Sequence, residues 1–283
     1  MEYLMTYGWA ILIIAVVLGA LFQLGVFNSS SFSPRAPPGA CQVFRPSGPG
    51  TTTNINLMGV CTGQLPQYVA QFNGQGSYVF SNLAIRKAQI FANGLTFSAW
   101  IRTNAIGINA IVGQNDGFGC TYFCDLGLEI NYVSGKASMI AHDGSVYRFA
   151  TSTSTVNDGN WYNIVGTYNV ANSLSIYING ANQQNTAITN LYGNPSNTLI
   201  GLQDTASGAK QYFSGQIANV QIYNTSLSAN QVQALYLEGI GGAPMKLQNL
   251  VGWWPLNGNA NDYSGNNNNG VPTAVTFTSQ YGK

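Results

Sequence analysis

The feature that most constrains this chain is an uncharged apolar run at its N-terminus. Residues 3–27 read YLMTYGWAILIIAVVLGALFQLGVF and contain no charged side chain. As an α-helix the run would be about 38 Å long at about 1.5 Å per residue, which is enough to cross a bilayer. A secretory signal peptide has a shorter apolar region behind a basic start, whereas here Glu2 precedes the run. The sequence therefore predicts a long N-terminal hydrophobic α-helix over residues 1–27.

Two roles are open for such a helix. It can be a plain membrane anchor, because aromatic residues cluster at one end as they do at membrane interfaces. It can instead form the core of a filament, because an acidic residue at the head of a membrane helix is unusual and Glu2 can meet the N-terminal ammonium of a neighbouring copy. Small residues would allow helices to approach closely. The candidate assembly residues are Glu2, Tyr3, Tyr7, Trp9, Gly19 and Ala20.

Residues 1–22, MEYLMTYGWAILIIAVVLGALF, resemble the hydrophobic segment of archaeal type IV-like pilins, the class III signal peptide family. The acidic residue of that family falls on Glu2 and its tyrosine on Tyr3. The sequence departs from the family in lacking the short basic leader and the Gly-Gln junction that a prepilin peptidase cuts. The resemblance implies a subunit that is inserted in the membrane before assembly and then polymerises through its N-terminal helix into an extracellular cell-surface filament.

Charged residues make up only 7% of the chain, against about 25% in typical proteins, and the net charge is +1. A basic surface large enough for nucleic acid cannot be built from ten Lys and Arg residues offset by nine acidic ones. Solubility must come from amide and hydroxyl side chains, which do not titrate. Because few carboxylates are available to be protonated, we expect stability to depend weakly on pH.

Residues 28–66 are rich in Ser, Pro, Gly and Thr and are predicted to form an extended linker with a disulfide loop. The four cysteines form an even set, and their order favours the pairs Cys41–Cys61 and Cys120–Cys124, although other pairings remain open. Disulfides would place the chain in an oxidising, extracytoplasmic compartment. The two N-glycosylation sequons begin at Asn28 and Asn224.

The pattern from residue 67 onward is that of β-strands. In LTFSAWIRT the alternate residues Leu95, Phe97, Ala99 and Ile101 share one face, with Trp100 on the other. LSIYING, at 174–180, alternates in the same way and ends in the hairpin signal Asn-Gly. Similar runs recur at 161–169, 196–201 and 215–223. Many short strands of this kind predict an all-β jelly-roll sandwich.

One short late helix interrupts the β pattern. Ser228 is its expected N-cap, with Gln231 at the capping-box position. Val232, Leu235 and Tyr236 lie on one side of this helix, and Gly239 is expected to end it.

The β region resembles the LamG-like, concanavalin-type lectin fold. The landmarks of that family appear in order as FNGQGSYV at 72–79, LTFSAWIRT at 95–103, WYNIVGTYN at 161–169, LSIYINGA at 174–181 and GQIANVQIYNTSLSANQVQALY at 215–236. The resemblance implies a sandwich over residues 67–283.

The segment 250–283 resembles the opening of that family, yet it closes this chain. Circular permutation within one chain is the favoured explanation, so that 250–283 supplies the first strand of its own sandwich. The alternatives are donation of this strand to a neighbouring subunit and the start of a second, truncated repeat.

Catalysis is not expected. Glucan-cleaving enzymes of this fold carry two glutamates and an aspartate along one strand. Here Glu129 stands alone in LGLEINY, with Asp125 four residues before it. His142, Asp143 and Ser145 crowd one turn without an oxyanion-hole motif, which is typical of a surface turn.

A calcium site is the one cofactor expectation. Asp262, Ser264, Asn266 and Asn268 place side-chain oxygens at alternate positions of a Gly-rich loop. Calcium accepts about six to eight oxygen ligands, and LamG-like domains often bind it at a comparable Asp-x-Ser-Gly-Asn loop, as the resemblance implies here. The alternative is an Asn-rich turn capped by Asp262.

The family binds sugars through loops at one end of the sandwich, with aromatic rings stacking on pyranose faces and amides bonding hydroxyls. Aromatic candidates include Trp161, Tyr162, Trp253 and Trp254, but the sequence does not assign a carbohydrate-binding residue. We therefore expect a structural subunit of a type IV pilus-like filament with a lectin-like head for adhesion or glycan binding. A monomeric membrane-anchored surface lectin and a polysaccharide-degrading enzyme are the alternatives.

Overall fold

The computed structural model describes residues 13–18, 41–44, 52–55, 66–85, 90, 92–115, 126–130, 134–189, 191, 197–204 and 210–279. Residues 1–35 and 36–283 form two separate compact units.

The prediction of a long N-terminal helix is wrong. The described helix spans only residues 13–18, which is about 9 Å of helix. Helices draw most of their stability from burying an apolar face. Here the side chains from Ile13 to Leu18 other than Ala15 are 50–63% exposed, so the described helix leaves its apolar side chains largely unburied. The predicted assembly residues lie outside the described residues. No helix in the described part of the chain is both long and apolar enough to span a membrane.

The larger sheet of the second unit has eight strands among the described residues, and its neighbouring strands run antiparallel. In spatial order they are β12 (Ala181–Ala187), β11 (Ser173–Ile178), β10 (Trp161–Asn169), β5 (Leu95–Arg102), β16 (Ser214–Tyr223), β3 (Val69–Asn73) and β19 (Thr276–Thr278), with β17 (Leu250–Trp254) pairing on β16.

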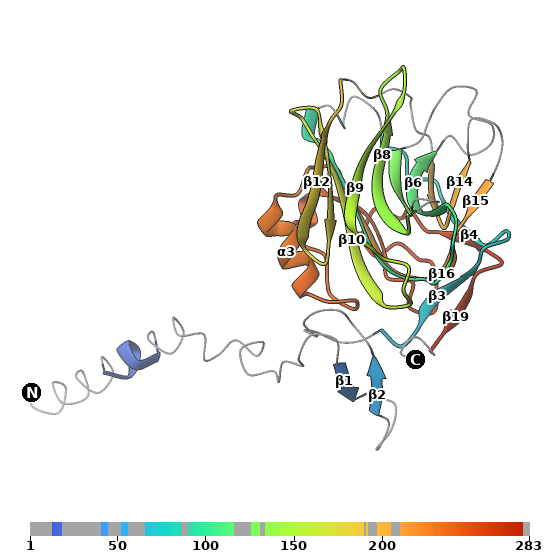
Figure 1. The fold of residues 1–283 in the computed structure, drawn as a ribbon. Helices are drawn as coiled ribbons and strands as arrows, with labels where there is room; N and C mark the ends of the chain where they lie inside the picture. Colours follow the sequence, from blue (N-terminus) through green and yellow to red (C-terminus); the bar gives the residue numbers. More distant parts are fainter. Residues whose placement is uncertain are drawn as a thin grey trace, which may run out of the picture. The chain divides into compact units, whose positions relative to one another are not determined.

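The second sheet has seven strands within the same described ranges. Their order is β18 (Val271–Thr273), β4 (Tyr78–Ser81), β13 (Asn197–Ile200), β6 (Asn109–Asn115), β7 (Leu126–Ile130), β8 (Lys136–His142) and β9 (Tyr147–Thr155). The two sheets enclose the main hydrophobic core, which confirms the predicted all-β sandwich (Figure 1).

The alternation seen in the sequence decides which side chains enter that core. Leu95, Phe97, Ala99 and Ile101 of β5 all lie in it, whereas Trp100 points to the opposite face and stacks on Tyr236. The hairpin joining β11 to β12 turns at Asn179 and Gly180, whose φ angles of 50° and 79° are those of a type I′ turn. The sequence therefore predicted both the inward face and this turn.

The outer face of the larger sheet is covered by α3 (Ala229–Leu237), which lies beside β12 in Figure 1. The backbone N–H of Ser228 donates to Gln231 Oε1 at 2.9 Å, as the predicted capping box requires. Val232 and Leu235 of α3 pack against Val165 of β10 and Leu250 of β17 in a second, smaller core. Gly239, at φ 80°, follows the helix as expected.

The C-terminal segment pairs with strands of its own chain. After η2 (Leu247–Asn249), β17 pairs with β16, β18 with β4 and β19 with β3. The last residue of β19, Thr278, lies opposite Val69, the first residue of β3.

Two small antiparallel pairs complete the described strands. β14 (Leu202–Asp204) pairs with β15 (Lys210–Tyr212). β1 (Cys41–Phe44) pairs with β2 (Thr52–Ile55), so the region predicted as an extended linker contains a strand pair.

The two sheets also meet at one margin, where β9 and β12 are joined by side chains. The backbone N–H of Thr151 on β9 donates to Gln184 Oε1 on β12 at 2.7 Å, and Thr186 Oγ1 donates to the carbonyl oxygen of Phe149 at 2.9 Å. These bonds occupy backbone groups that an edge strand would otherwise leave unpaired.

Candidate functional site

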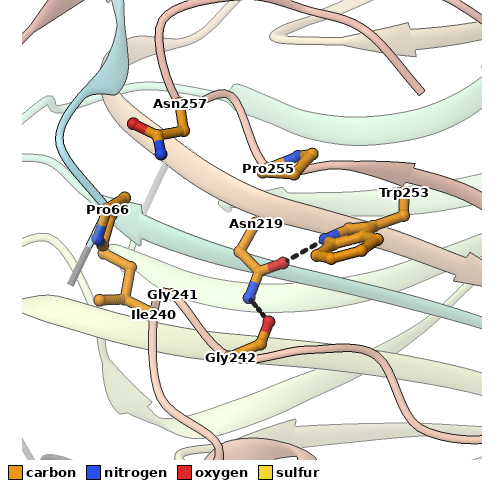
Figure 2. A pocket seen from close by; sticks show the side chains of 8 residues that line it. All are labelled: Pro66, Asn219, Ile240, Gly241, Gly242, Trp253, Pro255 and Asn257. Atoms are coloured by element: carbon orange, nitrogen blue, oxygen red, sulfur yellow. Dashed lines mark hydrogen bonds between the residues drawn. The ribbon is translucent and has the colours of Figure 1, made fainter. Parts of the chain in front are cut away.

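A small pocket of about 100 Å³ opens where β16, β17 and the segment after α3 meet (Figure 2). β16 contributes Asn219, and β17 with the residues that follow it contributes Trp253, Pro255 and Asn257. The remaining wall comes from the chain before β3 and after α3. The described residues that line it are Pro66, Asn219, Ile240, Gly241, Gly242, Trp253, Pro255 and Asn257.

The alternation of β17 places its two tryptophans on opposite faces. Trp254 is fully buried in the main core, and its Nε1 donates to the carbonyl oxygen of Asn268 at 3.0 Å. Trp253 is half-buried on the outer face, where it packs against the smaller core and lines the pocket. Trp253 is therefore the tryptophan of this pair that a ligand can reach.

Asn219 fixes the position of the Trp253 ring. The pairing of β16 with β5 is irregular between Ala218 and Gln221, and Asn219 sits in that bulge with φ 49°. Asparagine tolerates this left-handed conformation better than most residues. Its Oδ1 accepts a hydrogen bond from Trp253 Nε1 at 2.8 Å, and its Nδ2 donates to the carbonyl oxygen of Gly242 at 3.0 Å. Figure 2 shows the Asn219 amide between these two partners.

A buried chain of polar side chains supports Asn219 along β16. Gln221 Nε2 donates to Asn219 Oδ1 at 2.9 Å, and Tyr223 Oη donates to Gln221 Oε1 at 2.6 Å. Burial raises the pKa of the Tyr223 hydroxyl, so this group remains a proton donor across the physiological pH range. The network ties Trp253 to the interior of the sheet and makes the pocket wall rigid.

Two further contacts concern Tyr263, which packs on Trp253, and Asn257 of the lining. The ring of Tyr263, which is 54% exposed, packs edge-on against the Trp253 ring with centroids 6.2 Å apart. Asn257 is exposed, and its Oδ1 accepts a hydrogen bond from the backbone N–H of Tyr68 at 2.8 Å. Figure 2 shows the Asn257 amide nitrogen on the side of Pro66.

The described residues of the lining include no charged side chain. Its polar groups are amides and backbone atoms, and its apolar groups are an indole, two prolines and Ile240. Such a wall can offer an aromatic face and hydrogen bonds to a neutral ligand. No Asp or Glu stands among the described lining residues, whereas a glycoside hydrolase uses a pair of carboxylates.

The family model for the concanavalin A-like lectin/glucanases superfamily matches residues 73–233, which is more than half of the chain. The chain belongs to this superfamily. The match includes β16 and thus Asn219, whereas Trp253 lies beyond it. No curated protein sequence matches the chain.

Two solved structures share the superfamily fold. One is a candidate carbohydrate-binding protein from Bacteroides ovatus ATCC 8483, with TM-score 0.57 and 14% identity over 81% of this chain. The chain spans 66% of the length of that protein. The other is a heptameric SAP-like pentraxin from Limulus polyphemus, with TM-score 0.52 and 15% identity over 76% of this chain and 96% of the pentraxin. At these identities the likeness concerns the fold alone.

The four residues of the predicted calcium loop lie together between β17 and β18. The Asp262 carboxylate already accepts four hydrogen bonds, from the backbone N–H groups of Trp253, Ser264 and Asn268 and from Ser264 Oγ. Asn266 Nδ2 donates to the carbonyl oxygen of Leu250 at 3.0 Å. In the described part of the chain, no three His, Cys, Asp or Glu side chains gather as a metal site. Calcium binding remains a prediction, and this donor set fits the ion poorly.

The remaining predicted positions are dispersed. Asn224 is half-buried after β16, where its Oδ1 accepts from Asn249 Nδ2 at 3.2 Å. Cys41 begins β1, and its side chain lies outside the described residues, as do Cys61, Cys120, Cys124 and Asn28. Disulfide pairing and glycosylation therefore stay predictions.

The turn at 142–146 joins β8 to β9. Asp143 Oδ1 accepts the backbone N–H groups of Ser145 and Val146, both at 2.9 Å, and Oδ2 accepts Arg148 Nε at 2.7 Å. Burial lowers the pKa of His142, whose Nδ1 accepts the backbone N–H of Gly144. Every one of these bonds closes the hairpin, so the turn has a structural role.

Sequence reasoning missed Asn219 and Asn257. Asn219 interrupts the apolar alternation of GQIANVQIY, and that interruption was the signal of a bulge. Asn257 belongs to an Asn-Gly pair. Nothing in the sequence indicates that it lines the same pocket as Pro66.

Proposed function

We propose that the chain is a carbohydrate-binding module that takes an uncharged glycan at the pocket beside Trp253. The observation that carries this proposal is the half-buried Trp253 ring, fixed by Asn219, in a wall that contains amides and no charge. A pyranose presents an apolar C–H face and a rim of hydroxyls, which match an indole face and amide groups.

Two other facts support a glycan ligand. The superfamily is named for lectins as well as glucanases, and the Bacteroides structure is named as a candidate carbohydrate-binding protein. Binding is favoured over hydrolysis because the described part of the pocket wall offers no carboxylate. A pocket of about 100 Å³ holds part of one sugar ring.

The decisive experiment screens the full chain against neutral and acidic glycans and measures the affinity of a hit by calorimetry. Trp253→Ala is expected to weaken binding about tenfold or more. Phe149→Ala is the matched control, because Phe149 is also an exposed aromatic, 38% accessible, but lies on β9 of the other sheet. Equal affinity of Trp253→Ala and the native chain, or release of reducing sugar from a bound glucan, would refute the proposal.

We further propose that residues 250–279 are the family's opening segment in a circularly permuted order. The pairing of Thr278 with Val69 supports this, because a tight turn between β19 and β3 would restore the unpermuted connection.

Filament assembly is not included in the proposed function, because it depended on a long N-terminal helix and the described helix spans residues 13–18. An extracytoplasmic location is part of it, supported by the even set of four cysteines and the two sequons. Mass spectrometry of the secreted chain, with and without reductant, tests that location through the two predicted disulfides.

A further inference from the structure

The carboxylate of Asp262 is saturated with hydrogen bonds from its own chain. Its Oδ1 accepts from the backbone N–H of Trp253 at 2.9 Å and of Ser264 at 2.8 Å. Its Oδ2 accepts from the backbone N–H of Asn268 at 2.8 Å and from Ser264 Oγ at 2.9 Å. An ionised carboxylate offers about four lone-pair sites, so none is left for a further ligand.

The neighbouring side chains are bonded through the hydroxyl of Ser264 and the amide nitrogens of Asn266 and Asn268. Ser264 Oγ accepts from Asn266 Nδ2 at 3.1 Å. The amide nitrogens of Asn266 and Asn268 donate to the carbonyl oxygens of Leu250 and Val251, which binds the loop to β17. A calcium ion needs about six to eight oxygen ligands and would have to displace several of these N–H donors.

One bond of Asp262 reaches the backbone of Trp253, which in turn bonds the backbone of Tyr263. The backbone of Trp253 is held from both sides, because its N–H donates to Asp262 and its carbonyl oxygen accepts the N–H of Tyr263 at 2.8 Å. The same connection brings the Tyr263 ring against the Trp253 ring at 6.2 Å. Asp262 therefore acts on the backbone of the residue whose indole Asn219 holds from the other end.

We infer that Asp262 is a positioning residue of the proposed glycan pocket and that it orients Trp253 and Tyr263 without a calcium ion. The role of Asp262 in glycan binding rests on the proposed function. That the loop needs no calcium ion is independent of that function. A loop that resembles a family calcium loop thus serves as a hydrogen-bonded support for the aromatic wall.

The test uses the full chain with Asp262→Asn, which replaces one accepting oxygen by an amide that faces the N–H of Asn268. Asp158→Asn is the matched control, since Asp158 is likewise a carboxylate bonded within a turn, where it accepts three bonds, from the Asn160 backbone N–H, Asn160 Nδ2 and Tyr162 Oη, before β10. Ser264→Ala is a milder second variant, which removes one donor to Oδ2 in case Asp262→Asn fails to fold.

Three readouts are expected to agree. Excess CaCl₂ or EDTA leaves the melting temperature of the native chain unchanged. Asp262→Asn increases acrylamide quenching of tryptophan fluorescence, and this increase disappears in a Trp253→Phe background. Glycan affinity falls about tenfold in Asp262→Asn, falls less in Ser264→Ala and stays unchanged in Asp158→Asn.

A rise in melting temperature with CaCl₂ that Asp262→Asn abolishes would overturn the inference, because it would identify a calcium site. Unchanged quenching in both Asp262→Asn and Ser264→Ala would also overturn it. A native chain that binds no glycan would instead refute the proposed function, while the calcium and quenching measurements still decide the role of Asp262.

Discussion

The indole N–H of Trp253 donates a 2.8 Å hydrogen bond to Oδ1 of Asn219, which occupies a left-handed position in a bulge of β16. The bond joins the C-terminal strand β17 to a central strand of the larger sheet. It leaves the faces of the indole ring unengaged in hydrogen bonding, which is what a stacking ligand requires.

Replacing Asn219 by alanine is expected to destabilise the fold by about 1–3 kcal/mol, because the substitution leaves Trp253 Nε1, Gln221 Nε2 and the carbonyl oxygen of Gly242 without their partner. Asn219→Gly separates the loss of hydrogen bonds from backbone strain, since glycine accepts the φ of 49° without strain but restores no bond. Urea unfolding of both variants measures the difference. If Asn219→Gly is as stable as the native chain, the hydrogen bonds contribute little and backbone strain dominates.

The acid sensitivity of the fold is expected to depend on Asp143. The backbone N–H of Val146, then the side chain of Arg148 and the backbone N–H of Ser145, hold the pKa of this carboxyl well below its usual range. A depressed folded-state pKa adds stability that is present at neutral pH and is lost as the pH falls below the ordinary value of about 3.9. Asp143→Asn should lower the melting temperature at pH 7 and flatten its decline in acid. Parallel pH profiles of the two proteins would contradict this expectation.

Moving residues 247–279 ahead of Pro66, with a short Gly-containing turn between β19 and β3, should give a protein that folds as a monomer. The antiparallel pairing of Thr278 with Val69 places those ends within one turn of each other. Circular dichroism, melting temperature and light scattering test the outcome. A domain-swapped dimer or an unfolded chain would show that the native order of segments is needed.

The sequence predicted those parts of the fold that are determined locally. Alternation in Leu95–Ile101 indicated the inward face of β5. Asn179-Gly180 indicated the turn between β11 and β12, because few residues tolerate two positive φ angles in succession. The Ser228–Gln231 pair likewise marked the start of α3.

The candidate site could not be predicted in this way. Asn219 and Trp253 are 34 residues apart, and they meet only because a bulge in β16 turns the amide towards β17. The error at the N-terminus has a related cause: hydropathy records that residues 3–27 are apolar, but it does not record whether anything packs against them.

The margin between β9 and β12 is joined through the side chains of Gln183, Gln184 and Thr186 and not through a ladder of backbone hydrogen bonds. Substitutions at these surface positions can therefore loosen the sandwich along one side while every strand keeps its place. The distance between the sheets at that side can change in small steps during evolution, independently of the wall that Trp253 forms.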